Sequence, residues 1–588
     1  MQNDKNKQAR RTLDCDVLVI GSGAAGLTAA VTAAEHGLSV VVAEKAEQLG
    51  GTSAWSGGWL WIPRNPLARA EGLVEEGDAP ERYLREQTHC QRLDALQQAY
   101  LQRGPEMIEF FQSRTAVQFY SGSRMPDMRD GDGASAGGRS LCAQPFDGRL
   151  LGDTLKRMRA PLDIVSLFGM GIAGGADMAA FFNARRSPRA ALHVASRLLR
   201  HLRDCLLQGR GRQLVNGNAL VARLLRSALD RQVELLSASP AHHLLHANGR
   251  VYGAVLQQAQ GELLVNAHRG VVLACGGFPH DRQRIAQLIA HAPTGTEHHS
   301  AAPLENTGDG LRLGETVGAV VAADLAHAGA WAPVSCVPRR DGSVGNFPHL
   351  VDRAKPGFIA VRRDGKRFTN EADCYHDFMN ALIEATPAGE PIEAWLICDA
   401  KARWRYGIGW AKPLPFSDGY YQRRGYLHSG ANSAELAARC AIDASALQAT
   451  LERFNHFASL GEDPDFQRGR STYNRAQGEA LQQPNPSLRA LRGRLYAVKL
   501  HPGSLGTFAG LRTDADARVL DAGSQPIDGL FAVGNDMNSV MAGHYPSGGI
   551  TLGPAMTFGY LAGLALADDS TSRQTARPVP TQQEVQAL

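Results

Sequence analysis

The sequence predicts an α/β fold with two domains, one of them discontinuous. A short apolar strand near the N-terminus runs through a glycine-rich turn into a helix of small residues, and a second strand follows that helix directly. Two later segments repeat the strand-to-glycine pattern, which would return the chain to the same sheet. Because 588 residues exceed one ordinary core, a further domain is expected between these returns.

The first strand, DVLVI, leads into the turn GSGAAG. Gly21 permits the tight turn, Gly23 lets the backbone approach a pyrophosphate, and Gly26 allows the helix to pack closely on the strand. The helix N-terminus adds N–H groups and a positive dipole end, supplied here by Ala24 and Ala25. This arrangement predicts a Rossmann-type dinucleotide site.

The second strand, residues 38–43, ends in Glu44. An acidic residue at this spacing hydrogen-bonds the adenosine ribose hydroxyls. A carboxylate also disfavours a 2′-phosphate, which argues against NADP. We place Lys45, the next residue, in the same site.

A second cluster of glycines and hydroxyl side chains, GGTSAWSGG, follows Glu44 closely. Simple NAD enzymes lack such a cluster, whereas the pyrophosphate, ribityl chain and ring of a flavin need small neighbours and backbone N–H groups along their path. The pattern therefore favours FAD. The candidate contacts are Gly51, Thr52, Ser53, Ser56, Gly57 and Gly58.

The two later returns supply further candidates. HRGVVLACGGF (268–278) and GLFAVGND (529–536) are each a strand that runs into glycine, so both should end beside the first turn. We assign to the FAD site the residues Gly276, Gly277, Gly534, Asn535, Gly549 and Leu552.

Composition excludes several other classes of function. The formal net charge of +4 implies no nucleic acid partner, and nine dispersed cysteines without CxxC spacing indicate reduced thiols and no metal site. The polar leader has no signal-peptide core, and no stretch approaches the ~20 apolar residues of a membrane span. We expect a cytoplasmic protein.

These elements, in this order, resemble the flavoprotein family that contains succinate dehydrogenase, the soluble fumarate reductases and the 3-ketosteroid dehydrogenases. The resemblance covers nearly the whole chain. It implies a Rossmann-like FAD-binding domain formed by residues 1–298 and 490–588, with an inserted α+β substrate-binding and catalytic domain over residues 299–489.

The motif AGHYPSGGITLGPAMTFGYLAG separates branches of that family. Succinate and fumarate enzymes carry an arginine here that clamps a dicarboxylate, and its absence predicts a neutral substrate. GGTSAWSGG also lacks the histidine to which succinate dehydrogenase attaches flavin, so FAD should be non-covalent. The motif is similar to the Δ1-dehydrogenase branch, which implies that the Tyr545 hydroxyl and Gly549 N–H polarise a ketone oxygen.

A second family motif, GxRFxNE followed by a tyrosine, reads GKRFTNEADCY here. The resemblance implies that Tyr375 is the base that removes a proton next to the ketone. Because an unperturbed tyrosine has a pKa near 10, neighbouring donors or positive charge must lower that value.

One part of the pattern is missing, since Met128 and Arg129 stand where ketosteroid dehydrogenases place another tyrosine that supports the base. Tyr120 or Arg129 are the candidate substitutes. Ser547 gives a Tyr-x-Ser arrangement that resembles the Δ4-(5α)-dehydrogenases, which desaturate a different bond of the same ring.

We interpret the sequence as an FAD-dependent dehydrogenase that introduces a carbon–carbon double bond next to the carbonyl of a cyclic ketone, in the first place a 3-ketosteroid at Δ1. A proton would be abstracted, a hydride would reach flavin N5, and electrons would pass to a quinone or other acceptor. The alternatives are a Δ4-(5α)-ketosteroid or cyclohexanone desaturase and an ene-reductase working in reverse. A basic amphipathic stretch, residues 185–212, is either a solvated surface helix or a membrane-surface contact.

Overall fold

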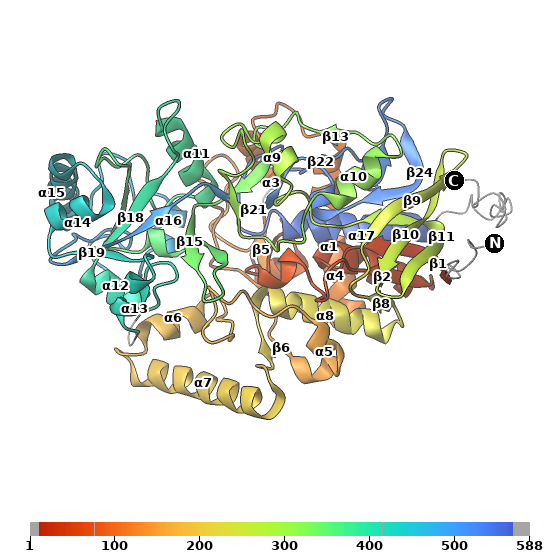
Figure 1. Cartoon of the computed structure of the whole chain (residues 1–588), viewed down its shortest axis with the longest axis horizontal. Coiled ribbons are helices and arrows are strands. Elements are labelled where there is room, and N and C mark those ends of the chain that lie inside the picture. Colours follow the sequence, from red (N-terminus) through yellow and green to blue (C-terminus); the bar gives the residue numbers. More distant parts are fainter. Residues whose placement is uncertain (1–10, 76, 414–415, 569–588) are drawn as a thin grey trace, which may run out of the picture.

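The computed structural model describes residues 11–568 except 76 and 414–415 (Figure 1). The polar leader before Arg11 therefore lies outside the described residues. An eight-stranded sheet has the order β23-β24-β10-β11-β1-β2-β8, and β9 pairs with β10. Its strands are β1 (Arg11–Ile20), β2 (Val40–Ala43), β8 (Glu234–Leu236), β9 (Ala241–Ala247), β10 (Arg250–Gln258), β11 (Gly261–Leu273), β23 (Arg518–Leu520) and β24 (Pro526–Ala532).

The predicted returns of the chain to one sheet are confirmed. β1 pairs in parallel with both β2 and β11, and β11 pairs in parallel with β24. The central strands are buried on both faces, which explains their continuous runs of valine, leucine and isoleucine. All four strands point their carboxyl ends at the same edge, and a ligand that crosses this edge meets all four strand ends.

Helices of small residues cover this sheet. α1 (Ala24–Glu35) packs against α17 (Leu552–Asp568) and α8 (Asn216–Asp230). The approach of α17 is close because a Cβ at Gly559 would meet the Ala25 carbonyl oxygen at 2.5 Å, and one at Gly563 would meet the Ala29 oxygen at 2.9 Å. The glycines of the C-terminal motif therefore seat α17 on the first helix.

A second sheet, of order β17-β18-β20-β19, forms most of the inserted part. Its strands are β17 (Phe358–Val361), β18 (Ala394–Asp399), β19 (His428–Gly430) and β20 (Leu495–Leu500). The sequence boundary at residue 490 placed β20 in the FAD domain, but β20 pairs with β18 along its full length. An apolar strand carries no mark of which sheet it joins, so this pairing could not be read from the sequence.

Short sheets link the two parts. They consist of β12 (His299–Ser300), β21 (Gly503–Thr507) and β14 (Gly329–Trp331); β13 (Val321–Ala322) and β22 (Gly510–Leu511); β15 (Val334–Pro338) and β16 (Val344–Pro348); β3 (Trp59–Trp61), β5 (Ser140–Ala143) and β4 (Phe119–Ser121); and β6 (Phe146–Asp147) and β7 (Gln213–Leu214).

The remaining helices surround these sheets (Figure 1). They are α2 (Pro66–Ala70), α3 (Ala79–Gln87), α4 (Ala95–Arg114), α5 (Thr154–Arg157), α6 (Ala176–Asn183), α7 (Pro188–Gln208), α9 (Arg282–Leu288), α10 (Asp309–Glu315), α11 (Tyr375–Ala385), α12 (Ala400–Tyr406), α13 (Asp418–Arg423), α14 (Ser433–Cys440), α15 (Ala444–Leu460) and α16 (Thr472–Gln477).

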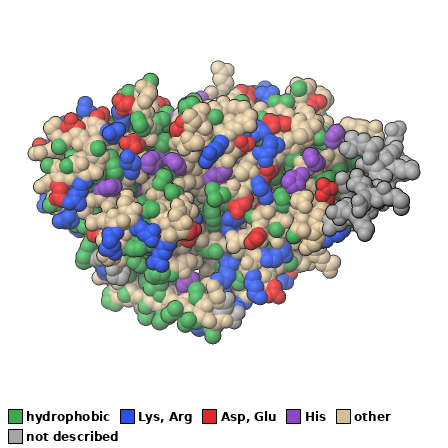
Figure 2. All heavy atoms as spheres, viewed as in Figure 1, with side chains coloured by type: hydrophobic (Ala, Val, Ile, Leu, Met, Phe, Trp, Pro, Cys, Tyr) green, Lys and Arg blue, Asp and Glu red, His purple; other side chains and the backbone are tan. Residues whose placement is uncertain are grey.

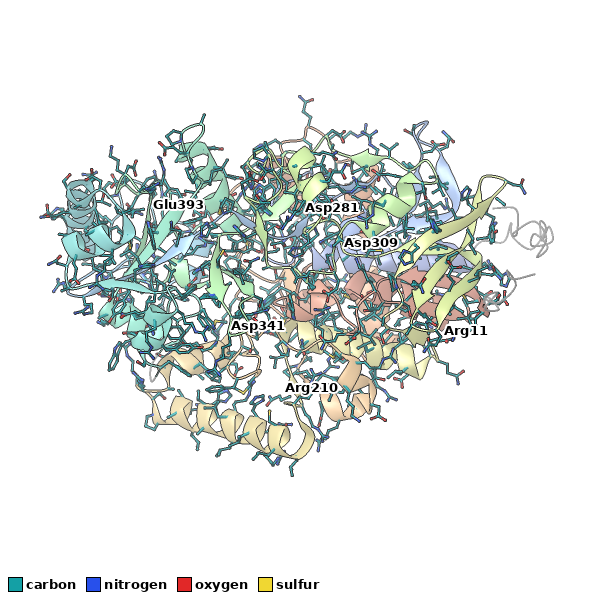
Figure 3. The ribbon with its side chains drawn as sticks, viewed as in Figure 1. Arg11, Arg210, Asp281, Asp309, Asp341 and Glu393 are labelled. Atoms are coloured by element: carbon teal, nitrogen blue, oxygen red, sulfur yellow. The ribbon has the colours of Figure 1, made fainter. Side chains whose placement is uncertain are left out.

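The basic amphipathic stretch forms α7, which runs along the lower edge of the molecule in Figure 1. Figure 2 shows hydrophobic side chains along the same edge. Just beyond the helix, Arg210, labelled in Figure 3, donates hydrogen bonds to the carbonyls of Leu155 and Met158 at 2.7 and 2.8 Å. No helix in the described part of the chain is long and apolar enough to cross a membrane.

Candidate active site

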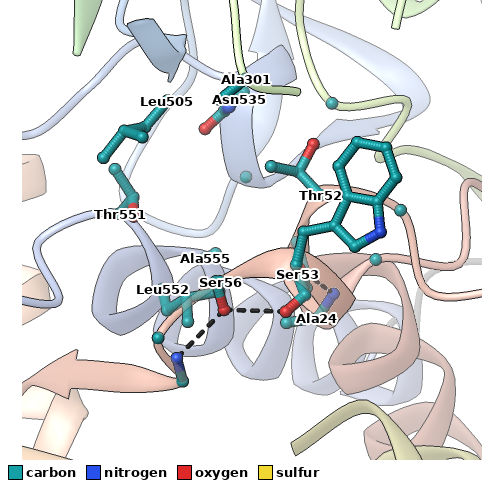
Figure 4. A pocket seen from close by; sticks show the side chains of 18 of the residues that line it. Ala24, Thr52, Ser53, Ser56, Ala301, Leu505, Asn535, Thr551, Leu552 and Ala555 are labelled. Carbon is teal, nitrogen blue, oxygen red and sulfur yellow. Dashed lines mark hydrogen bonds between the residues drawn. The ribbon is translucent and has the colours of Figure 1, made fainter. Parts of the chain in front are cut away.

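One cavity joins the predicted cofactor residues to the predicted catalytic residues. Figure 4 shows it between the turn after β1 and the start of α17. Gly26 and Gly277 lie outside its lining. The predicted site residues that line the cavity are Gly21, Gly23, Ala24, Ala25, Glu44, Lys45, Gly51, Thr52, Ser53, Ser56, Gly57, Gly58, Gly276, Gly534, Asn535, Leu552, Tyr375, Tyr545 and Gly549.

The first glycine turn is shaped by close backbone contacts. Gly21 has φ +117°, and a Cβ there would meet the Ala274 carbonyl oxygen at 2.1 Å. Gly23 caps α1, and a Cβ at Gly26 would meet the Gly21 oxygen at 2.1 Å. Gly26 therefore lets the helix pack against the turn, while Gly21 and Gly23 leave an open cradle at the helix N-terminus. Such a cradle fits a pyrophosphate.

Glu44 is held in place by donors from two segments. One carboxylate oxygen accepts from the Ser22 backbone N–H at 3.0 Å and the other from the Ala46 N–H at 2.9 Å. Its carboxylate lies at the edge of the cavity, with lone pairs left for hydroxyl donors. The position fits an adenosine ribose.

The second glycine and hydroxyl cluster folds over the N-terminus of α1. The Ala24 N–H donates to Ser53 Oγ at 2.9 Å, and Ser56 Oγ donates to the Ser53 carbonyl at 2.7 Å (Figure 4). Ser56 Oγ in turn accepts from the Gly58 N–H at 3.1 Å. The cluster is thus an ordered wall of the cavity, with small side chains along the path that FAD needs.

Three residues at this end, Asn306, Asp309 and Asp536, stand in segments that the sequence marks as part of the flavin fold but not as site residues. Asn306 donates to Thr52 Oγ1 at 3.0 Å and to the Gly276 carbonyl at 3.2 Å, so it joins the cluster to the end of β11. Asp309, labelled in Figure 3, pairs with Lys45 at 2.7 Å. Asn306 and Asp309 belong to the segment NTGDG, which the resemblance assigns to the flavin fold as a structural stretch, and the structure places both residues at the cavity.

Asp536 explains why Gly277 does not line the cavity. Its buried carboxylate accepts from the Gly277 N–H at 2.9 Å, and burial raises the pKa of Asp536 to about 6. A Cβ at Gly277 would meet Thr507 Oγ1 at 2.0 Å. Gly277 therefore holds the end of β24 against the end of β11.

At the other end of the cavity two tyrosines meet. Tyr375 begins α11, and its ring lies 4.9 Å from that of Tyr545, edge to face. They are 6% and 3% exposed. Burial, followed by the electrostatic influence of Tyr545, raises the pKa of Tyr375 well above its ordinary value, and burial raises the pKa of Tyr545 as well.

Gly549 presents a backbone donor to the cavity. Its carbonyl accepts from the Trp61 N–H at 3.1 Å, whereas its own N–H has no acceptor among the described residues. Its φ is +104°, and a Cβ there would meet the Trp61 nitrogen at 2.6 Å. Only glycine fits this position, and the free N–H fits the role of a donor to a ligand oxygen.

Neither candidate substitute for the missing tyrosine reaches the cavity. Arg129 Nε donates to Asp377 Oδ2 at 2.9 Å, and Tyr120 packs edge-on against Trp59. Met125 and Met128 line the wall instead.

A third tyrosine lines the same end of the cavity. Tyr473, in α16, is 2% exposed and influences the pKa of Tyr375. Its sequence neighbours, STYNRAQ, belong to no motif that marks a site. Only the packing of α16 against the loop before α11 shows that Tyr473 belongs there.

The loop that carries Tyr375 is fixed by buried ion pairs. Arg367 binds both oxygens of Glu371 at 2.8 Å, and Arg468 Nη1 contacts Glu371 Oε2 at 3.0 Å. Although burial alone would raise the pKa of Glu371, these arginines hold it below its ordinary value. Because the carboxylate stays ionised and paired, the loop is rigid where it enters α11.

The wall between the tyrosines and solvent is mostly apolar. Two cations line the cavity, and both are paired at the dinucleotide end: Lys45 with Asp309, and Arg159 with Glu305 at 3.2 Å. The apolar side chains of the wall are Trp59, Met125, Met128, Leu162, Met178, Pro348, Leu350 and Val351.

The remaining candidate groups lie as follows in the described ranges. No group of three or more His, Cys, Asp or Glu side chains there could hold a metal ion. The nine cysteines are free thiols. Ser547, of the Tyr-x-Ser arrangement, is fully buried and does not line the cavity.

The chain is similar to known proteins over nearly its whole length. The family model of an FAD binding domain matches residues 16–552. A 4-oxocyclohex-2-ene-1-carboxylate 5-dehydrogenase of Sinomonas cyclohexanicum is 39% identical over 97% of this chain and 96% of that protein. A 3-oxosteroid 1-dehydrogenase of Mycobacterium tuberculosis is 37% identical over 95% of this chain and 99% of that protein.

A solved structure agrees with these relatives. The 3-ketosteroid Δ1-dehydrogenase of Sterolibacterium denitrificans, in complex with 1,4-androstadiene-3,17-dione, matches with a TM-score of 0.86 and 35% identity over 94% of this chain and 99% of that one. The cavity, its glycine cradle and these matches together identify FAD as the cofactor. The chain belongs to the FAD-binding flavoprotein family, in the branch similar to the 3-ketosteroid Δ1-dehydrogenases, and is an FAD-dependent oxidoreductase.

Proposed function

We propose that the protein is a 3-ketosteroid Δ1-dehydrogenase. The observation that carries the proposal is that Tyr375, Tyr545 and the unpaired N–H of Gly549 share one cavity with the FAD cradle. Removing a proton next to a ketone develops negative charge on the ketone oxygen. A hydroxyl and a backbone N–H directed to that oxygen would stabilise the charge.

Each residue has a distinct part in the proposed reaction. The Tyr545 hydroxyl and the Gly549 N–H bind the ketone oxygen, and Tyr375 removes the proton from the neighbouring carbon. Bound non-covalently, FAD supplies the acceptor for the hydride from the next carbon. Because burial raises the pKa of Tyr375, the base needs hydrogen-bond donors that favour its ionised form.

The composition of the cavity wall supports a neutral steroid as the substrate. Relatives of almost equal identity are named for a steroid and for a carboxylated cyclohexenone. A carboxylate would need an available cation, but Lys45 and Arg159, the cations that line the cavity, are both paired with acids. A broad apolar wall favours a neutral, polycyclic ketone.

The burial of Ser547 supports the choice of Δ1 for the new double bond. A Δ4-(5α)-type reaction would be favoured by a Ser547 hydroxyl in the cavity. Because Ser547 is buried outside the lining, Δ1 desaturation is the better-supported reaction.

The test is anaerobic mixing of the holoprotein with androst-4-ene-3,17-dione, 4-oxocyclohexanecarboxylate or succinate, followed by the oxidised flavin band near ~450 nm. We expect bleaching by the steroid and release of a Δ1 product. Bleaching by the carboxylate alone would assign the protein to the cyclohexanone desaturases. In a third outcome, an enone reoxidises the chemically reduced flavin faster than the saturated ketone bleaches the oxidised flavin. That result would assign the protein as an ene-reductase.

The reduced flavin would pass its electrons to a quinone or other acceptor. Stopped-flow mixing of the steroid-reduced protein with a short-chain quinone should restore the oxidised band. Restoration by NAD⁺ but not by quinone would contradict this choice.

We further propose that α7 rests on an anionic membrane surface of a cytoplasmic compartment. It exposes leucines between exposed arginines, while its one acid, Asp204, is buried. Met178 of the adjacent α6 lines the cavity, so a lipophilic substrate could enter from that side. The exposed leucines are Leu192, Leu199, Leu202, Leu206 and Leu207.

Co-sedimentation with vesicles tests the membrane contact. Binding should require anionic lipid and fall when Leu199 and Leu206 are replaced by serine. A matched control replaces Leu304 and Leu460, which are similarly exposed outside α7, by serine and should bind as the wild type does.

A further inference from the structure

The reaction proposed above leaves the base without a partner. In the free protein the ring of Tyr375 packs edge-on against that of Tyr545, and Tyr545 raises the pKa of Tyr375. A tyrosine hydroxyl has a single proton to donate. When Tyr545 donates it to the ketone oxygen, it can no longer support an ionised Tyr375, so another donor is needed in a buried, apolar setting.

Tyr473 has the features of that donor. It is 2% exposed, it lines the cavity, and its hydroxyl forms no hydrogen bond with any described residue. A hydroxyl of a cavity-lining residue that has no protein partner is available to hydrogen-bond a ligand or a reacting group. Tyr473 is close enough to raise the pKa of Tyr375, and Tyr545 in turn raises the pKa of Tyr473.

The helix that carries Tyr473 is tied to the loop that carries the base. Asn474 donates to Asp373 Oδ1 at 2.8 Å and accepts from Asn370 Nδ2 at 2.8 Å. These bonds join α16 to the residues immediately before Tyr375. The two tyrosines are therefore held in one rigid unit, as a precise hydrogen bond between them requires.

A buried cation partly offsets the effect of burial on Tyr473. Burial raises the pKa of Tyr473, and Cys374 adds to the rise, but the guanidinium of Arg353 opposes it. Arg353 is 1% exposed, and it packs over the ring of Phe378 in α11. Because the pKa of Tyr473 stays raised overall, Tyr473 keeps its proton and can donate it in a hydrogen bond to an ionised Tyr375.

We propose that Tyr473 is the positioning residue that replaces the missing upstream tyrosine: its hydroxyl donates a hydrogen bond to the Tyr375 oxygen while Tyr545 and Gly549 hold the ketone. This inference rests on the proposed function. Tyr473 lies in α16 of the inserted part. The pattern of related enzymes instead places the supporting tyrosine near Met128, far from α16 in sequence.

The test compares Tyr473→Phe with Tyr120→Phe, a matched control that removes a tyrosine hydroxyl outside the cavity. In Tyr473→Phe, flavin reduction by the ketosteroid should slow about 10- to 100-fold, as for one hydrogen bond to a charged group. The pH at which this reduction rate rises should increase by roughly one to two pH units. FAD content and the KM for the ketone should stay within about twofold, because the ring that packs in the site is retained.

A merely structural role would leave the pH profile of Tyr473→Phe where the wild type has it, and that result would overturn the inference. A second measurement needs no turnover: with 1,4-androstadiene-3,17-dione bound as an unreactive product, so that Tyr545 is engaged by the ketone, the tyrosinate absorbance that disappears in Tyr375→Phe should titrate at higher pH in Tyr473→Phe than in Tyr120→Phe. An unchanged titration would also overturn it. Failure of the wild type to react with any ketone would contradict the proposed function, while the titration would still decide the role of Tyr473.

Discussion

At the dinucleotide end of the cavity most contacts come from the backbone, whereas at the tyrosine end they come from side chains of distant segments. The cradle around Gly21 and Gly23 is one continuous turn, and neighbouring strands complete it. The tyrosine end brings together residues 375, 473 and 545, each at the start of a helix or in a loop. Backbone sites tolerate little change in shape, while side-chain sites tolerate changes in shape better than changes in chemistry.

The largest effect is expected at the backbone end, for Gly21→Ala. The added Cβ would meet the Ala274 oxygen at 2.1 Å, where φ is also +117°, so the turn must shift away from the FAD path. We expect protein purified without bound flavin and therefore without measurable turnover, as read from the flavin-to-protein absorbance ratio.

Gly37→Ala is the matched control for that change. Its φ is +84°, yet nothing lies within 4 Å of a Cβ there. It should cost no more than ~1 to 3 kcal/mol of stability, the range for backbone strain alone, and keep its FAD. Equal loss of FAD in both variants would show that conformational strain, and not the close approach, governs the cradle.

The next largest effect is expected at the side-chain end, for Tyr375→Phe. Losing an acid–base group should slow anaerobic flavin reduction by ~10²–10⁴-fold, with FAD binding unchanged. Because burial raises the pKa of Tyr375 and the base acts when ionised, the wild-type rate should rise about tenfold per pH unit below that pKa. A variant that keeps both the rate and the pH slope would remove Tyr375 from the mechanism.

Tyr545→Phe should have a somewhat smaller effect. Removing one donor to the ketone oxygen typically costs ~10²–10³ in rate, and the N–H of Gly549 remains. Unlike Tyr375→Phe, this variant should keep the pH slope of flavin reduction, because its base is intact. A rate close to that of the wild type would mean that Tyr545 only packs against Tyr375.

The sequence predicts some parts of the cavity much better than others. The sheet and the FAD cradle follow from short glycine spacings, because a turn, a strand end and a helix start are local. Asn306 and Asp309 were not predicted as site residues, since they reach the cavity only when β11 and α10 are in place. Tyr473 could not be identified as a site residue either, because it reaches the cavity only when α16 packs against the loop before α11.

The inserted part carries the weaker sequence signal. The sequence does not show that β20 pairs with β18, because strand pairing is a long-range choice that an apolar hexapeptide does not record. Tyr375 and Tyr545 were placed by resemblance to known motifs. The motif pattern predicts their partner near Met128, where the structure has Met125 and Met128 in the cavity wall and Arg129 paired with Asp377.

Glu44→Gln should weaken FAD binding without changing the rate of flavin reduction. The carboxylate accepts from the N–H groups of Ser22 and Ala46, so the charge-assisted part of these bonds is lost. The Kd for FAD should rise ~10- to 100-fold. The reduction rate measured at saturating FAD should stay the same, and a slower rate there would link the two ends of the cavity.

The smallest effect is expected for Ser547→Ala, although Ser547 lies two residues from Tyr545 in the motif. Its side chain is fully buried and stands outside the cavity lining. Loss of a small hydroxyl that does not touch substrate should change the reduction rate by less than about twofold and leave the Δ1 product unaltered. Mass spectrometric and NMR identification of the product would settle this. A shift of the double bond, or a loss as large as that of Tyr545→Phe, would mean that the serine turns into the cavity during the reaction, and the choice of bond would then have to be reassigned.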